Sequence, residues 1–480
     1  MNTFSPFTLL SLSCMGPELV LLSLGIMLIV VDLFFKNSLS LPWLTVSGTL
    51  IALLLLLNTS SATVFGNMYI VDGYSVFFKM VCLVGVLFTV LFSERYLEIE
   101  RLHHDEYYSL LIFCTVGMMA MVSAGDLIVV YLGLELMALS AYCLVGLLKQ
   151  DSRANEASLK YFLMGAFSSG LLLYGISLIY GLTGTTDLNV ISQRIVSMGL
   201  MDNHALLLGI GLVLVAFCFK LGAAPFHMWA PDVYEGAPSS ITAFLAVAPK
   251  AAAFAVIGRV LMMGFPDVHI HWGPLLALIA VLTMAIGNIA AIAQKSLKRM
   301  LAYSSVAHAG YALLGILAGN SEGLSATMNY LFIYAFMNMG AFAILILLCD
   351  SKRCGEQLDD YRGLAKTNPL AAALMLVFLF SLAGIPPTAG FIGKFYLLVA
   401  AVHAGYIVTV VAAMIFSVIS AYYYLRVIRY MYFENPEQEI AVSMSSGMKT
   451  ALALALIGMV GMAIIPAPIL SFAGKSLIGF

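Results

Sequence analysis

Residues 220–238 of the chain read KLGAAPFHMWAPDVYEGAP and interrupt a long apolar segment. A proline inside a helix removes one backbone hydrogen bond and clashes with the preceding turn, so Pro225 predicts a broken helix here. Residues 382–395, LAGIPPTAGFIGKF, interrupt a second apolar segment with two adjacent prolines. Each interruption carries a lysine close to the break. Matched breaks of this kind in two halves of a membrane protein indicate a transport site.

The composition indicates a lipid environment. The 480 residues are 62% hydrophobic and 10% charged, with a mean hydropathy of +0.99. A soluble domain has about 25% charged residues, and no basic patch here is dense enough for nucleic acid. The seven cysteines form no CxxC pair, and no GxGxxG after a strand or GxxxxGK[ST] motif occurs. We therefore expect an integral membrane protein that carries no metal, iron–sulfur cluster or nucleotide cofactor itself.

The fold class follows from the apolar segments. A helix needs about 20 mostly apolar residues to span a bilayer. Fourteen segments qualify: 17–35, 40–58, 73–93, 106–124, 126–148, 156–182, 204–222, 239–262, 273–294, 299–319, 324–349, 369–403, 405–433 and 447–473. The sequence therefore predicts an all-α integral membrane protein of about 14 transmembrane helices.

The distribution of positive charge predicts the orientation. With fourteen spans, sixteen Lys and Arg residues fall on one side of the membrane, against Arg194 and Lys475 on the other. The positive-inside rule makes the first side cytoplasmic, so both termini are expected to face outward. Five cations remain inside spans. Of these, Lys79 and Arg259 lie near enough to helix ends to extend to the membrane surface.

The two broken helices occupy equivalent places in the order of segments. Each is the fourth helix of a five-helix group, and because five is odd the two groups must have inverted topology. The predicted domains are an N-terminal unit of three helices (1–105), two inverted repeats (106–262 and 272–433) and a C-terminal helix (434–480).

Lys220 lies just before the first break, in AFCFKLGAAPFH. A lysine at the centre of a bilayer costs at least about 2.5 kcal/mol, and burial eases the loss of its proton. We therefore interpret Lys220 as a proton-binding residue; the alternative is a lysine held in a structural pair. Glu135, in VVYLGLELMALSAY, is the only carboxylate deep in the apolar part of the first repeat. It is the expected partner of Lys220.

Three further residues complete the predicted proton-transfer set. Lys250 follows Pro249, which lacks an amide hydrogen and so frees a backbone carbonyl one turn earlier. Lys394 follows the second break and is the counterpart of Lys220 by role. His308, in AYSSVAHAGY, can relay protons because histidine titrates near neutral pH, although a buried histidine is more often a satisfied packing residue.

Other polar residues have simpler interpretations. Asp126 precedes the fifth helix and is expected to cap it. His227 follows Pro225 and either relays protons or caps the broken end. Lys160 lies near the start of the sixth helix, at the membrane interface. Glu18 and Asp32 lie at the ends of the first helix and are also expected at the interface.

Three stretches carry a resemblance to a known family. KLGAAPFHMWAPDVYEGAP is the most specific, and SLKRMLAYSSVAHAGY and SLAGIPPTAGFIGKFYL add to it. Over residues 10–475 the chain resembles the antiporter-like membrane subunits of the proton-pumping NADH:quinone oxidoreductase, respiratory complex I. PDVYEGAP favours the subunit N group, and Lys394 stands where the sister subunit M carries a glutamate.

The resemblance implies a fold of fourteen helices with two inverted repeats. It places the family's proton-transfer residues on Glu135, Lys220, Lys250, Lys394 and His308. It also implies a proton-translocating subunit that is coupled to quinone reduction elsewhere in the complex. NADH, FMN, iron–sulfur clusters and quinone are expected in partner subunits. The other membrane-arm subunits and the lipid bilayer are the expected partners, and the bacterial inner (plasma) membrane is the expected location.

Three alternatives stay open. A subunit of a multi-subunit Na⁺/H⁺ antiporter shares the fold and the lysine–glutamate pattern, and only DVYEGAP favours complex I over it. A membrane scaffold would not require four buried ionisable residues near broken helices. A solute symporter would require a polar substrate pocket, whereas the breaks carry Lys, Gly and Pro but few other polar groups.

Overall fold

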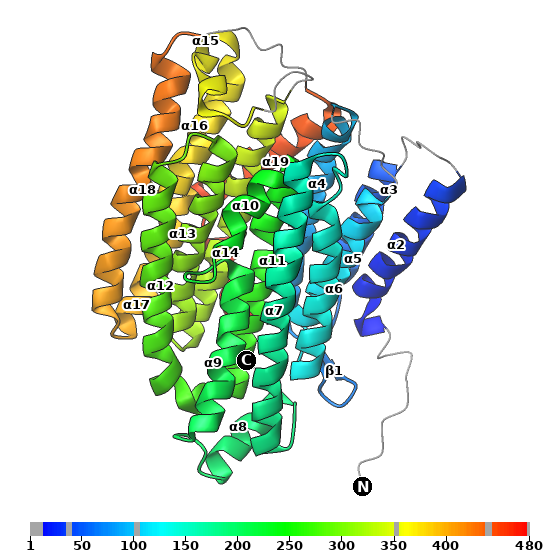
Figure 1. Ribbon diagram of the computed structural model, residues 1–480, viewed down its shortest axis with the longest axis vertical. Coiled ribbons are helices and arrows are strands. Elements are labelled where there is room, and N and C mark those ends of the chain that lie inside the picture. Colours follow the sequence, from blue (N-terminus) through cyan, green and yellow to red (C-terminus); the bar gives the residue numbers. More distant parts are fainter. Residues whose placement is uncertain (1–12, 35–40, 100–105, 350–354, 437–443, 478–480) are drawn as a thin grey trace.

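The computed structural model describes residues 13–34, 41–99, 106–349, 355–436 and 444–477. Within these residues the chain is a bundle whose helices run side by side along one axis (Figure 1). The N-terminal helices α2 (Gly16–Phe34) and α3 (Leu41–Leu57) lie at one edge, and α18 (Ile407–Phe433) lies at the opposite edge. One short antiparallel hairpin, β1 (Ala62–Val64) and β2 (Tyr69–Val71), connects α3 to the next helix.

The remaining helices follow in chain order. They are α4 (Gly73–Ile99), α5 (Tyr107–Val122), α6 (Leu127–Val145), α7 (Ser152–Thr183), α8 (Leu188–Ser197), α9 (His204–Leu221), α10 (Trp229–Gly236), α11 (Ser239–Arg259), α12 (His269–Ile292), α13 (Leu297–Leu317), α14 (Ser321–Leu347), α15 (Leu364–Thr367), α16 (Pro369–Ala383), α17 (Ala389–His403), α19 (Ser446–Ile464) and α20 (Ala467–Ser476). Short π or 3₁₀ turns occupy Val260–Gly264 (η1), Pro266–Val268 (η2) and Leu358–Tyr361 (η3).

The helices match the predicted spans. Among the described residues, eleven helices are long and apolar enough to cross a membrane. The apolar helices α3 and α5 and the pair α16 and α17 account for the other three predicted segments. The all-α multi-span fold is therefore confirmed. The domain boundaries stay a prediction.

Both predicted breaks are present, and they share a local design. Gly222 follows α9 and Gly384 follows α16 as C-caps, and each glycine has a left-handed backbone, with φ of +67° and +80°. Such a residue closes the last helical turn, and glycine adopts it without steric cost. The cis peptides Ala224–Pro225 and Pro386–Pro387 follow, and the chain then re-enters a helix as α10 or α17.

Three helices form the centre of the bundle. Helices α11, α13 and α14 are almost wholly buried, whereas α2, α7 and α18 leave much of their apolar surface exposed. Helices that are hydrophobic all round are expected in the core of a membrane bundle. The central helices carry Lys250 and His308, so these side chains are screened by neighbouring helices on all sides.

Two details of the predicted secondary structure are wrong. The last predicted helix, 447–473, is divided into α19 and α20, because Pro466 cannot donate to the preceding turn. Helix α8 was not predicted; it is ten residues long and amphipathic, so a search for apolar segments of spanning length passes over it.

Gly390 lies where the two half-helices of the second break pack closely against each other. A Cβ atom at Gly390 would clash with the Ser381 carbonyl oxygen, which belongs to the backbone and cannot turn aside. We expect Gly390→Ala to destabilise the protein by about 1–3 kcal/mol or more. Gly170→Ala is the matched control, because Gly170 is exposed in α7 with no atom within 4 Å of its added Cβ. The measurement is the thermal unfolding midpoint of each purified variant; equal midpoints would contradict the expectation.

Candidate functional site

The five predicted site residues lie on five different helices. Glu135 is on α6, Lys220 on α9, Lys250 on α11, His308 on α13 and Lys394 on α17. The three lysines and His308 are buried, with 3–6% of their surface exposed, and Glu135 is half-buried. Within the described residues none of the three lysines forms a salt bridge. Their ammonium groups are held by hydroxyl groups, carbonyl oxygens and aromatic rings instead.

Lys220 occupies the last turn of α9, beside the first break. Its Nζ donates to Tyr142 Oη at 3.4 Å and lies 5.6 Å from the centre of the Tyr142 ring. The Phe219 ring is at a similar distance, 5.7 Å. The negative end of the α9 dipole also favours a cation at this position.

Glu135 lies close to Lys220 but does not touch it. Ser169 Oγ donates to Glu135 Oε1, and the adjacent Ser168 contacts the Ala216 carbonyl at 3.4 Å. Ala216 is one helical turn from Lys220, a rise of about 5.4 Å. Within the described residues no salt bridge joins Glu135 to Lys220, so the expected pairing is not a direct one. Tyr142 lies two turns along α6 from Glu135, on the same face.

Aromatic side chains fill the space between Lys220 and Lys250. Tyr142 packs against Tyr161 at 4.7 Å between ring centres, and Tyr161 stacks on Trp229 at 4.6 Å. Trp229 then contacts Tyr234, 5.9 Å away, whose ring lies 6.0 Å from Lys250 Nζ. The break brings Trp229 and Tyr234 here, because both belong to α10.

Lys250 is held between α10 and α13. Its Nζ donates to the Ser305 carbonyl oxygen at 2.8 Å and also to the Ser305 hydroxyl group. Pro249 leaves the Leu245 carbonyl without its helical donor, as predicted, and Tyr234 Oη donates to that oxygen at 3.2 Å. The polar spot expected beside Lys250 is therefore present.

His308 is surrounded by tyrosines. Its Nδ1 lies 2.5 Å from Tyr330 Oη, and its Nε2 lies 3.1 Å from Tyr424 Oη. The Tyr424 hydroxyl group also bonds to Ser304. The His308 ring lies 6.2 Å from that of Tyr311, one turn further along α13. Both ring nitrogens thus have partners that can donate or accept a proton.

Lys394 closes the second break. Its Nζ donates to the carbonyl oxygens of Leu382, at 3.2 Å, and Ala383, at 2.9 Å. These are the last residues of α16, whose terminal carbonyls have no helical donor. Ser417 Oγ, at 3.3 Å, and the Tyr311 ring, at 4.8 Å, complete the surroundings. Lys220 ends the first half of its broken helix, whereas Lys394 lies in the second half.

The site contains residues that the sequence analysis missed. Tyr142, Tyr234, Tyr330, Tyr424 and Ser305 contact the predicted lysines or His308 directly. A sequence signal existed for Tyr142, which shares a helix face with Glu135. None existed for Tyr330 or Tyr424, because they approach from α14 and α18.

The structure also places the polar residues to which the sequence assigns roles other than proton transfer. Asp126 caps α6 as predicted, since its Oδ1 accepts from Ile128 N at 2.7 Å. Lys160 is partly exposed near the start of α7, and Asp32 is half-buried in the last turn of α2. His227 is not a cap, because Met228 occupies the N-cap position of α10.

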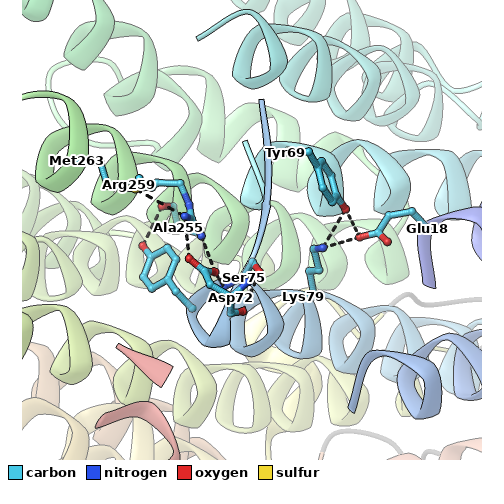
Figure 2. A network of polar contacts seen from close by, with 9 residues as sticks. Glu18, Tyr69, Asp72, Ser75, Lys79, Ala255, Arg259 and Met263 are labelled. Atoms are coloured by element: carbon cyan, nitrogen blue, oxygen red, sulfur yellow. Dashed lines mark hydrogen bonds and ion pairs between the residues drawn. The ribbon is translucent and has the colours of Figure 1, made fainter. Parts of the chain in front are cut away.

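Lys79, Glu18 and Arg259 form buried ion pairs that the sequence analysis did not predict. Figure 2 shows Lys79 beside Glu18, at 2.6 Å, with the Tyr69 hydroxyl group bonded to both. Arg259 forms two parallel bonds to Asp72, at 2.8 and 2.9 Å. Lys79 and Arg259 are each 1% exposed, so both side chains are enclosed by the protein. Their carboxylate partners come from α2 and from the residue after β2, so no helix pattern predicts these pairs.

The pKa values of Tyr69 and Asp72, which belong to these two ion-pair networks, are shifted by their surroundings. Burial, and then the charge of Glu18, raise the pKa of the Tyr69 hydroxyl group well above its usual value, so Tyr69 stays a donor. Burial alone would raise the pKa of Asp72, but the Arg259 guanidinium and the hydrogen bonds from Ser75 together outweigh it and lower the pKa of this carboxyl group.

The described residues contain no group of three or more His, Cys, Asp or Glu side chains that could hold a metal ion.

Comparisons with known proteins agree with this architecture. A family model described as "NADH:quinone oxidoreductase/Mrp antiporter, TM" matches residues 124–420. The NADH-quinone oxidoreductase subunit N of Desulfovibrio desulfuricans is 51% identical over 484 residues, with 96% of each chain covered. A chain of respiratory complex I from Thermus thermophilus is 33% identical with a TM-score of 0.83, over 95% of this chain and 99% of that one.

A chain of the Mrp complex from Dietzia sp. is 22% identical with a TM-score of 0.80, over 98% of this chain and 97% of that one, which shows a shared fold. The bundle, the two broken helices and the buried lysines define a multi-pass membrane protein of the antiporter-like class. The chain belongs to the family of NADH-quinone oxidoreductase N subunits.

The Arg259–Asp72 pair predicts a pH-dependent stability. Removing one partner of a buried pair costs about 3–5 kcal/mol, and we expect the lower value for Arg259→Met because the Asp72 side chain is 27% exposed. With Arg259 present the Asp72 pKa is depressed, so the pair stabilises the protein above about pH 4 and loses this effect as the pH falls through the depressed value. Without Arg259 the Asp72 pKa rises above its wild-type value, and the deficit relative to wild type should shrink as the pH falls.

The measurement is the thermal unfolding midpoint of the purified protein between pH 4 and 8. Asp72→Asn/Arg259→Met is the matched control, since it removes both charges and should recover much of the loss. A double variant less stable than Arg259→Met would contradict the proposed cause.

Proposed function

We propose that this chain translocates protons as a membrane-arm subunit of an NADH:quinone oxidoreductase, coupled to quinone reduction in other subunits. The observation that carries the proposal is the absence of a salt bridge at Lys220, Lys250 and Lys394 within the described residues. A buried ammonium group without a counter-ion gains little from keeping its charge. Such a group suits the transient storage of a proton.

The groups from Lys250 to Lys394 are more closely connected to one another than those around Lys220. Lys250 bonds to Ser305, and His308 lies one turn further along α13. His308 is linked to Tyr330 and Tyr424, and its neighbour Tyr311 faces Lys394. Chains of hydroxyl and imidazole groups of this kind transfer protons by successive donation and acceptance.

A surface recess borders two of the helices that carry this part of the site. A cavity of about 620 Å³ opens between α14, α17 and α20, lined by Glu322, Asn329 and Tyr396 among others. Asn329 precedes Tyr330, which bonds to His308, and Tyr396 is two residues after Lys394. Polar groups of Glu322, Asn329 and Tyr396 lie among a mostly apolar lining.

The setting of the chain completes the proposal. By the distribution of Lys and Arg, we place both termini on the outer side of a bacterial inner membrane. NADH, FMN, iron–sulfur clusters and quinone would be held by partner subunits of the complex. The alternative, a subunit of a Na⁺/H⁺ antiporter, rests on the family description and on fold likeness at 22% identity.

The test is NADH-driven proton pumping in membrane vesicles. We expect Lys220→Ala, Lys250→Ala and Lys394→Ala complexes to assemble and to pump fewer protons per NADH oxidised. The cause is the loss of a proton-transfer group, each of which typically contributes about 10²–10⁴-fold to a transfer step. Lys366→Ala is the matched control, because Lys366 is exposed and bonds only to Asn435 among described residues.

Assembly is checked in parallel by the amount of intact complex. If the three assembled variants pump at the wild-type ratio, the buried lysines are structural and the proposal is wrong. If the variants lose the sodium gradient but keep the proton gradient, the antiporter alternative is favoured.

A further inference from the structure

The PDVYEGAP motif carries charges that the proton-transfer set does not use. Its Asp232 and Glu235 lie on α10, and both bond to Arg299 at the start of α13. The Arg299 guanidinium lies 2.5 Å from Glu235 and 3.2 Å from Asp232, and Lys160 of α7 lies 2.9 Å from Asp232. We call these four residues the α10 clasp.

The neighbouring residues reinforce the same junction. Lys298, next to Arg299, donates to the Ala237 carbonyl oxygen at 2.7 Å and forms a salt bridge with Glu356 at 2.8 Å. Ala237 directly follows α10 and is its C-cap. Lys298 and Arg299, which are successive residues of α13, therefore bind the end of α10 and its acidic side chains.

The helices joined by the α10 clasp also carry two residues that surround Lys250. On α10, Tyr234 stands between Asp232 and Glu235, and its ring faces Lys250. On α13, Ser305 accepts from Lys250 and lies six residues beyond Arg299, a rise of about 9 Å. Lys250 is thus held between the two helices that the clasp joins.

The exposure of the clasp argues against a role in stability alone. Its side chains are 30–43% exposed, and they line a surface cavity of about 250 Å³. Ion pairs that solvent reaches contribute little to stability. They can, however, open and re-form easily, and α10 is only eight residues long, with a break before it and Pro238 after it.

We propose that the α10 clasp positions α10 against α13 and thereby couples the first broken helix to the Lys250 site. Its four members are positioning residues: they touch neither Lys250 nor His308 in the described structure. Breaking the clasp would let α10 move and change how Tyr234 and Ser305 surround Lys250. The functional consequence rests on the proposed proton translocation, whereas the positioning itself does not.

The experiment uses the whole complex. Arg299→Glu places a carboxylate against Asp232 and Glu235 and should open the clasp. We expect hydrogen exchange of the α10 backbone to become about two- to thirtyfold faster, the range found for changes along coupled networks. We also expect the protons pumped per NADH oxidised to fall towards the value for Lys250→Ala.

Charge exchange separates positioning from a general loss of structure. Glu235→Arg/Arg299→Glu restores an ion pair of opposite direction and should return both the exchange rate and the pumping ratio most of the way to wild type. Arg362→Glu is the matched control. Arg362 is 34% exposed against 33% for Arg299, and it also pairs with two carboxylates, those of Asp359 and Glu434. This control should change neither readout.

The outcomes decide between the two proposals. An unchanged α10 exchange rate in Arg299→Glu, or failure of the charge exchange to restore it, overturns the clasp. Faster exchange with rescue supports the positioning role even if Lys250→Ala pumps normally; that second result would overturn only the proposed function. If Arg299→Glu does not assemble, Arg299→Gln is measured in the same way.

Discussion

The structure depends on how charge is accommodated where no water is present. In a bilayer every backbone polar group needs a partner inside the protein, so unbroken helices leave nothing with which to hold an ammonium group. Breaks and prolines remove that restriction. Helix α16 is capped by Gly384 and presents the Leu382 and Ala383 carbonyl oxygens to Lys394, and Pro249 releases the Leu245 carbonyl oxygen to Tyr234. The buried helices around these points exclude lipid and keep the carbonyl dipoles fixed.

The same bundle contains two kinds of buried cation. Lys79 and Arg259 are each matched by a carboxylate, and such pairs fix helices α2, α4 and α11 together with a charge that does not change. Lys220, Lys250 and Lys394 lie as deep but are held by neutral groups. A charge held by neutral dipoles can be lost without leaving an opposite charge stranded. This difference in partners, rather than burial, separates the structural cations from the proposed proton carriers.

The fold was largely predictable because the bilayer imposes a length on every helix. Apolar segments of spanning length gave the main helices, and Pro225, Pro386 and Pro387 gave the breaks. Helix α8 and the division at Pro466 escaped, since neither depends on spanning length. Within the site, the deep ionisable residues were predictable from their cost alone, and so was the carbonyl freed by Pro249. The direct pairing of Glu135 with Lys220 was not a sound inference, because a carboxylate and a lysine on neighbouring helices can still be offset along the helix axis.

The sequence by itself determined the membrane setting, the order of the helices, the positions of the breaks and the identity of the buried lysines. These features are local: each follows from apolar length, from proline chemistry or from the presence of one ionisable residue. Only the tertiary structure decided which groups surround each lysine. Tyr424 reaches His308 across 116 residues and Asp72 reaches Arg259 across 187. Such contacts depend on how helices pack and rotate against one another, and helices that are apolar on every side carry no sequence pattern that specifies it.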